Sequence, residues 1–193
     1  RAHIDAVYTI SNEMLGISEI PAQGRIYKRA DDIDATKENT MDVTTERYRE
    51  TFEDMFGRSG DETLQVAFAD NPVGNVTFLN YLPAGFTIAR LLHFNTITMI
   101  MFGRWMNALA SILLMWIAIR KLPFGKASFA VFGLFPIILQ QIASCSYDGI
   151  LLGAVFVYMA YAISLLYSEE KSIEEFGVMF LAGGFCTVAC KGG

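Results

Sequence analysis

A single aspartate, Asp148, stands in a long apolar stretch, because no other charged residue lies between Lys126 and Glu169. It follows Ser144 and Ser146 in the segment ASCSYDGILLGAV. Its carboxylate could cap the apolar helix that follows, a role worth about 1 kcal/mol. It could also carry chemistry, since a carboxylate at the mouth of a helix hairpin costs far less than one at the middle of a bilayer. The sequence leaves both roles open, and one residue can fill both.

A second polar group lies inside another apolar segment. Arg104, Asn107 and Ser111 are spaced at i, i+3 and i+7, which places them on one face of a helix. An ionisable residue inside a spanning helix normally faces a bundle interior or a cavity. The alternative is that Arg104 extends its side chain back to the outer headgroups. Lys191, just past the last apolar run, is a further candidate cation.

The composition indicates what kind of protein must position these residues. Hydrophobic residues make up 53% of the 193 residues and charged residues only 18%, which indicates a membrane protein. Residues 1–78 hold 15 of the 20 acidic residues and 8 of the 15 basic residues. No basic tract interleaved with aromatic residues supports nucleic-acid binding. The three cysteines fit neither a disulfide framework nor a CxxC zinc site.

The apolar half of the chain predicts four spanning helices, at about 97–119, 127–143, 149–167 and 176–190. The first would be about 34 Å long, enough to cross a hydrocarbon core of about 30 Å. Pro136 lies inside the second, where neighbouring helices can satisfy the freed carbonyl. Basic residues in short loops stay on the cytoplasmic side. The three bases of the 120–126 loop therefore predict that residues 1–78 and the turn before Asp148 are extracytoplasmic.

The polar half of the chain shows shorter patterns. They predict amphipathic helices at 2–15 and 43–56, a strand in LQVAFA, and an interfacial helix at 79–93. Residues 17–41 are expected to be a loop whose charge cluster, KRADDID, is solvated, and His3 and Asp5 are expected to be solvated surface residues. The predicted fold class is all-α, a polytopic helical membrane protein with a large extracytoplasmic first loop that carries amphipathic and interfacial helices.

The order of these segments resembles that of the bacterial membrane proteins of the domain of unknown function 2142 family. The segments that carry the resemblance are HIDAVYTISNEMLG, YLPAGFTIARLLHF, FGRWMNALASILL, AIRKLPFGK, FPIILQQIASCSYDGI and a final CK. The resemblance covers nearly the whole chain. It implies a fragment that lacks the first spanning helix and the C-terminal part. The family looks like a relative of the C-type (GT-C) glycosyltransferases, which take a sugar from a polyprenyl-phosphate carrier at the outer face.

The resemblance implies a glycosyltransferase of cell-envelope glycan assembly, with a polyprenyl-phosphate-linked sugar as donor and membrane lipid as surroundings. His3 matches the histidine of an Asp-Glu-x-x-His motif whose acidic pair would precede Arg1. The implied catalytic residues are Asp148 and His3, and the implied substrate-binding residues are Arg104, Asn107, Lys191 and Tyr81. The cofactor stays unassigned, and a divalent metal ion is one option, with Asp148 as a candidate ligand. A transporter or lipid-handling protein without catalytic activity is the alternative, since the same polar residues could line a path.

Overall fold

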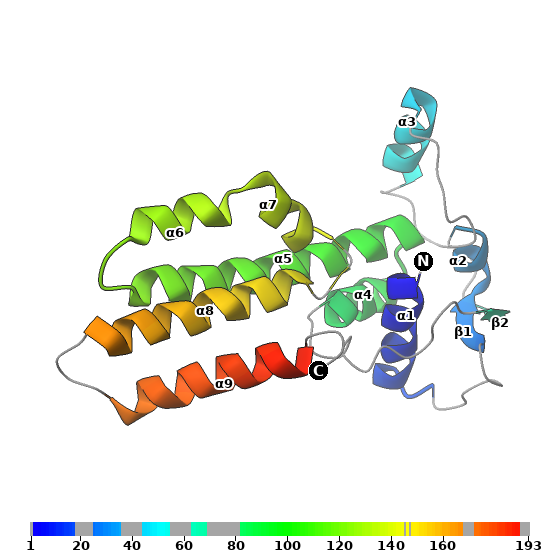
Figure 1. The fold of residues 1–193 in the computed structure, drawn as a ribbon. Helices are drawn as coiled ribbons and strands as arrows, with labels where there is room; N and C mark the ends of the chain where they lie inside the picture. The colour runs from blue at the N-terminus through cyan, green and yellow to red at the C-terminus, as the bar shows by residue number, and fades with distance from the viewer. Residues whose placement is uncertain are drawn as a thin grey trace. The chain divides into compact units, whose positions relative to one another are not determined.

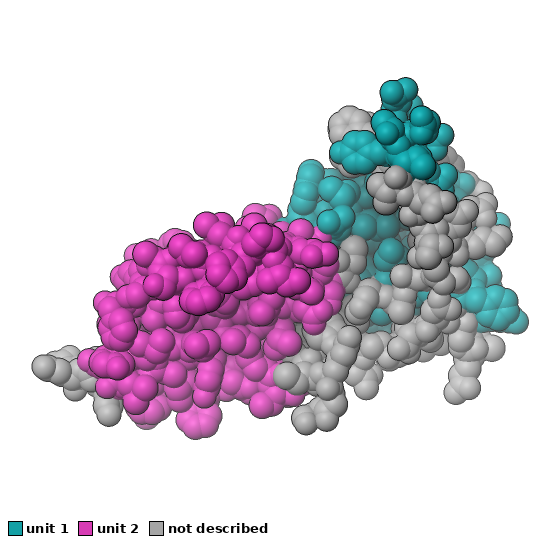
Figure 2. All heavy atoms as spheres, turned by 45° about the horizontal axis from the view of Figure 1, so that its top comes forward, with its two compact units in different colours: residues 1–106 teal, residues 107–193 magenta. Residues whose placement is uncertain are grey.

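A computed structural model describes residues 2–17, 25–35, 44–54, 63–68, 82–144, 146, 148–167 and 172–189 of the chain. The chain forms two compact units, residues 1–106 and residues 107–193 (Figure 2). Helix α5, Thr96–Lys121, begins in the first unit and ends in the second. The described residues are mostly helical, which confirms the predicted all-α class.

The first unit is built from short elements (Figure 1). They are α1 (Ala2–Met14), β1 (Arg25–Arg29), α2 (Ala30–Ala35), α3 (Thr45–Asp54), β2 (Leu64–Phe68) and α4 (Leu82–Leu91), followed by the start of α5. Helix α1 ends just before Gly16, whose φ of 73° favours glycine. Helix α1 packs against α4, and the Tyr8 and Phe86 rings meet edge to face with centroids 5.3 Å apart.

The loop predicted at residues 17–41 is wrong in part. Strand β1 and helix α2 lie within it, and β1 pairs antiparallel with β2 so that Tyr27 stands opposite Val66. A strand in a two-stranded sheet forms its backbone hydrogen bonds with the other strand. For β1 that other strand, β2, lies more than 30 residues further along the chain. The segment on its own carries no clear strand pattern. The predicted helices at 2–15 and 43–56 and the strand in LQVAFA are confirmed.

The second unit contains the rest of α5 and four further helices (Figure 1). They are α6 (Lys126–Gly133), α7 (Pro136–Ile142), α8 (Asp148–Tyr167) and α9 (Ile173–Ala189). Within the described residues, α5 and α8 are long and apolar enough to cross a membrane. Helix α8 packs along α9 and lies close to α5, because a Cβ added to Gly153 would stand only 2.9 Å from Leu114 Cβ. Small residues allow such close approach between membrane helices.

The helix predicted over 127–143 is not continuous. It is divided into α6 and α7, and Phe135 between them has extended backbone angles, φ −60° and ψ 136°. Pro136 explains the break, because its ring disfavours helical geometry at the preceding residue and it has no N–H to donate. Pro136 is instead the first residue of α7, a position that suits proline. The single helix predicted here is therefore wrong, and its crossing of the membrane stays a prediction.

Candidate functional site

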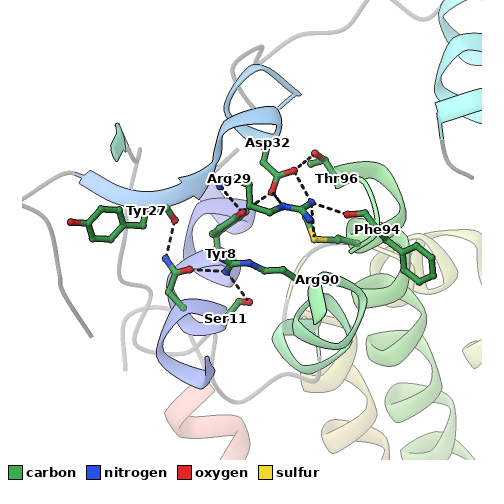
Figure 3. Close-up of polar contacts among 10 residues, drawn as sticks. Tyr8, Ser11, Tyr27, Arg29, Asp32, Arg90, Phe94 and Thr96 are labelled. Atoms are coloured by element: carbon green, nitrogen blue, oxygen red, sulfur yellow. Dashed lines mark hydrogen bonds and ion pairs between the residues drawn. The ribbon is translucent and has the colours of Figure 1, made fainter. Parts of the chain in front are cut away.

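The carboxylate of Asp32 lies at the centre of the first unit and is fully buried (Figure 3). Tyr8 Oη donates a hydrogen bond to it over 2.6 Å, and the Thr96 hydroxyl donates another. Arg29 donates from Nε over 2.8 Å and from Nη2 over 3.0 Å. We call these four residues the Asp32 network. It joins α1, β1, α2 and the start of α5 through one carboxylate. The charged donor Arg29 and the neutral donors Tyr8 and Thr96 compensate the cost of burying that carboxylate.

Arg29 has further partners around the network. Its Nη2 also donates to the Phe94 carbonyl over 2.8 Å, and its backbone N–H donates to Tyr8 Oη over 3.0 Å. Burial lowers the pKa of Arg29, but its hydrogen bonds to Asp32 and the charge of Asp32 outweigh burial, so the net pKa is raised. Burial, followed by the charge of Asp32, raises the pKa of Tyr8. Arg29 Nη1 is buried and has no hydrogen-bond partner in the described part of the chain.

A second buried ion pair joins β1 to α1. Lys28 Nζ lies 2.5 Å from Asp5 Oδ1, and the two side chains are 2% and 0% exposed. The prediction that KRADDID is solvated is therefore wrong for Lys28, Arg29 and Asp32, and Asp5 is not a solvated surface residue either. Burial is possible because each charge meets an opposite charge: Lys28 pairs with Asp5 of α1, and Arg29 pairs with Asp32, three residues further on. A sequence signal existed, since Asp5, Tyr8 and Asn12 share one face of α1 at helical spacing.

Arg90 of α4 is a buried cation whose hydrogen-bond partners are neutral, although the charges of Asp32 and Arg29 also act on it. Its Nη1 donates to Asn12 Oδ1 over 2.7 Å and to Ser11 Oγ over 3.5 Å, and its guanidinium carbon lies 4.7 Å from the centroid of the Tyr8 ring. Asn12 is itself held, since its Nδ2 donates to the Tyr27 carbonyl over 2.9 Å. Burial lowers the pKa of Arg90. Sequence reasoning placed this residue on an interfacial helix and missed its burial.

In the second unit, Asp148 begins α8, one residue earlier than predicted. Ser146 Oγ donates to Asp148 Oδ2 over 2.7 Å and accepts the Asp148 backbone N–H over 3.3 Å. The side-chain contact to the start of α8 thus comes from Ser146, whereas the sequence predicted that Asp148 would be the cap. Asp148 is half-buried. Its Oδ1 has no hydrogen bond among the described residues, so one carboxylate oxygen is available to a ligand.

Asn107 contacts the same serine. It is fully buried, and its Nδ2 donates to the Ser146 carbonyl over 2.9 Å. The Asn107 carbonyl accepts a hydrogen bond from Ser111 Oγ over 2.8 Å. Asn107 Oδ1 is buried and has no partner within the described ranges. The structure therefore joins two residues that were predicted separately, Asn107 and Asp148, through Ser146.

The remaining predicted site residues are less informative. Arg104 is half-buried in α5, with Nη1 3.9 Å from Met101 Sδ. His3 belongs to α1, but its side chain lies outside the described part, as do Tyr81 and Lys191 entirely. Among the described side chains, no three of the metal-ligating types gather into one site.

Comparison with known protein families gives a match. The sequence model of the family described as "Predicted membrane protein (DUF2142)" matches residues 60–191, which is more than half of the chain. The matched range contains Arg90 and Thr96 of the first unit and the Asn107, Ser146 and Asp148 contacts of the second. No curated protein and no solved structure matches the chain.

Proposed function

Because the chain belongs to the DUF2142 family of predicted membrane proteins, we propose that it is a C-type glycosyltransferase of the bacterial cell membrane. It takes a sugar from a polyprenyl-phosphate carrier at the outer face and transfers it during cell-envelope glycan assembly. Two helices of membrane-crossing length and composition support the membrane location. The segment order resembles that of the DUF2142 family, and the proposed activity follows from the likeness of that family to the C-type glycosyltransferases.

The observation that carries the proposal is the setting of Asp148. Its carboxylate lies in the first turn of a membrane-length helix, with one oxygen held by Ser146 and the other without a hydrogen bond among the described residues. Asn107 fixes the Ser146 carbonyl and so restrains the turn that carries both residues. A carboxylate restrained in this way suits a general base, which needs a fixed position and an oxygen open to the proton it removes.

The proposed step is the attack of an acceptor hydroxyl on the anomeric carbon of the donor sugar. The acceptor hydroxyl gives its proton to Asp148, and its oxygen bonds to the anomeric carbon of the sugar. The bond between that carbon and the carrier's phosphate oxygen breaks, and its electron pair stays on the phosphate. Cations stabilise the charge that develops there. The resemblance implies that Arg104 and Lys191 are these cations. It also implies that His3 is catalytic and that Tyr81 binds substrate.

Loss of the Asp148 carboxylate tests the activity. The full-length protein is reconstituted in lipid vesicles with polyprenyl phosphate carrying a radiolabelled hexose, and transfer to membrane glycan is counted. Asp148→Asn keeps the size of the side chain but removes the base, so transfer should fall at least 100-fold, about 3 kcal/mol of barrier.

The matched control is Glu174→Gln, which neutralises an exposed carboxylate in the first turn of α9. It should leave transfer unchanged. Transfer by Asp148→Asn at the wild-type rate, with equal insertion of both proteins in the membrane, would remove Asp148 from the mechanism. Absence of transfer by the wild type with this donor would count against the proposed activity itself.

The proposed orientation places residues 1–78 outside and both loops that flank the α6 to α8 segment on the cytoplasmic side. Lys121 at the end of α5 pairs with Glu175 at the start of α9, which supports a common side for the 120–126 and 168–175 loops. A membrane-impermeant thiol reagent added to intact cells should label a cysteine placed at Tyr48, an exposed residue of α3, and spare one placed at Lys126. The reverse pattern would invert the orientation.

A transporter or lipid-handling protein is the second candidate, and the break between α6 and α7 favours it. Discontinuous helices commonly line the substrate sites of secondary transporters. Here the break lies at Leu134 and Phe135, within an apolar segment. Movement of labelled polyprenyl phosphate between vesicle leaflets, with no sugar transfer in the same vesicles, would select this candidate over the glycosyltransferase.

A further inference from the structure

We infer that Arg90 marks a binding site for a phosphate group in the first unit. The inference rests on the proposed function, for which it supplies a phosphate contact that the sequence did not indicate. The ligand chemistry is a phosphate monoester, and its source is the head of a polyprenyl phosphate or free phosphate in solution.

The argument starts from the balance of buried charge in the first unit. Two buried carboxylates, Asp5 and Asp32, each have a cation of their own, Lys28 and Arg29. Arg90 is a third cation, 7% exposed, and no carboxylate pairs with it among the described residues. An unpaired buried guanidinium is costly, whereas an anion that pairs with it removes most of that cost. The cluster therefore has an excess of positive charge that an anionic ligand would compensate.

The contacts of Arg90 orient it without neutralising it. Asn12 and Ser11 accept hydrogen bonds from Nη1, and the Tyr8 ring lies against the guanidinium. All three neighbours are uncharged, because burial and the charge of Asp32 raise the pKa of Tyr8 and keep its hydroxyl protonated. A guanidinium held in one orientation is suited to phosphate, whose oxygens accept two parallel hydrogen bonds.

A second observation also points to an anion. Arg29 Nη1 is a buried donor without a partner in the described part of the chain, although the other nitrogens of Arg29 are well bonded. Figure 3 shows Arg29 and Arg90 both beside Tyr8, and the charge of Arg29 contributes to the lowered pKa of Arg90. The buried donor that lacks a hydrogen-bond partner thus belongs to a guanidinium, which is positively charged. Acceptor oxygens with negative charge are the groups that would satisfy it.

Ligand-dependent thermal unfolding of the full-length protein in detergent tests the site, because a ligand that binds only the folded state raises the midpoint. The probes are farnesyl phosphate, farnesol and sodium phosphate. Farnesyl phosphate should raise the unfolding midpoint and farnesol should not. An equal rise with sodium phosphate identifies free phosphate as the ligand, whereas a rise with farnesyl phosphate alone identifies the lipid. No rise with either phosphate overturns the inference.

Variants tie the binding to Arg90. Arg90→Gln should weaken the apparent Kd for the active probe at least tenfold, and Arg90→Lys should weaken it at least threefold because it cannot form the bidentate contact. Arg47→Gln, which removes an exposed arginine of α3 in the same unit, is the matched control and should bind like the wild type. Wild-type affinity in Arg90→Gln shows that Arg90 is structural only. If that variant does not fold, unchanged affinity in Arg90→Lys overturns the inference in its place.

The phosphate site at Arg90 and the glycosyltransferase activity can each be disproved without the other. Binding needs no sugar and no Asp148, so a phosphate site that depends on Arg90 in a protein without transfer activity would leave this inference standing and remove the glycosyltransferase. Sugar transfer that depends on Asp148 in a protein whose phosphate binding ignores Arg90 would do the opposite.

Discussion

The two units differ in the kind of residues that they bury. In the first unit, two ion pairs and a third cation are buried. One pair joins residues three positions apart, and the other hydrogen bonds of these groups include ones between residues 23 to 79 positions apart. In the second, the fully buried residues are mainly small or apolar. A buried hydrogen bond joins Asn107 to Ser146, and a partly buried ion pair joins Lys121 of α5 to Glu175 of α9. The first unit is specified by directional charged contacts, the second by close packing of helices.

This difference fits the solvents that we propose for the two units. Water drives apolar groups together and leaves buried ion pairs to select one arrangement. Lipid gives no such drive between helices, so small residues and tight contact decide how they pack. The two units should therefore be sensitive to opposite changes. Removing one charged group should damage the first unit, and adding one methyl group should damage the second.

The largest effect is expected from Asp32→Ala. The substitution leaves Arg29 buried without its anion and removes the acceptor for Tyr8 and Thr96. Breaking a buried pair in this way costs about 3–5 kcal/mol. Chemical unfolding of the detergent-purified protein, followed by Trp fluorescence and by protease resistance of the first unit, measures the loss.

The control for Asp32 is a pair on the surface of the same unit. Arg47 and Glu50 of α3 lie 3.8 Å apart with side chains 46% and 66% exposed. Glu50→Ala should cost about 0–1 kcal/mol. Equal losses from the buried and the exposed acid would contradict the central role given to the Asp32 network.

Tyr8→Phe should have the next largest effect. It removes the hydroxyl that donates to Asp32 and accepts from the Arg29 backbone, a loss of about 1.5–3 kcal/mol because one partner is charged. The folded protein raises the pKa of this tyrosine, so its contribution is complete below the ordinary value of about 10 and declines as the pH rises above it.

Unfolding midpoints of the wild type and Tyr8→Phe between pH 8 and pH 12, a range chosen to bracket the ordinary tyrosine pKa of about 10, check this dependence. The advantage of the wild type should be constant at the lower end and should shrink at the upper end. An advantage that grows with rising pH would mean that Tyr8 is stabilised as the phenolate.

In the second unit, Gly149→Ala should cost about 1–3 kcal/mol through overpacking. The added Cβ would lie 2.9 Å from Ile142 Cα, which is backbone and cannot move aside easily, and 3.1 Å from Ser111 Oγ. Gly184→Ala in α9 is the matched control, since nothing lies within 4 Å of its added Cβ. It should be neutral or stabilising by up to about 1 kcal/mol. Similar costs at both glycines would contradict packing as the basis of this unit.

The smallest effect is expected from Asn107→Leu, which removes the hydrogen bond to the Ser146 carbonyl and also the unpaired Oδ1. Hydrogen bonds between membrane helices contribute about 0.6 kcal/mol on average. Thermal unfolding should therefore show a loss of this order. A loss above about 2 kcal/mol would mean that a polar contact supports the second unit as strongly as one supports the first.

Sequence reasoning singled out polar residues that are isolated in apolar surroundings. Asp148 and Asn107 were visible because nearly all their neighbours are apolar, and the structure joins them through Ser146. The Asp32 network was missed because charged residues in a polar segment look the same whether they are solvated or paired. Only Asp5, Tyr8 and Asn12, on one face of a short helix, carried a usable signal.

The sequence by itself determined the apolar helices and most of their approximate limits, because hydrophobic periodicity acts within a few residues. The break before Pro136 was not predicted, and the structure shows that it divides one expected helix into α6 and α7. The tertiary structure decided which polar residues are buried. Lys28 belongs to a segment that reads as a solvated loop, and its burial depends on Asp5, a carboxylate 23 positions away. Arg29 and Asp32 are three positions apart, but their burial as a pair depends on Tyr8 and Thr96, which only folding brings to the same carboxylate. The desolvation of a buried charge is compensated by groups that surround it in space, and the local sequence does not reveal all of them.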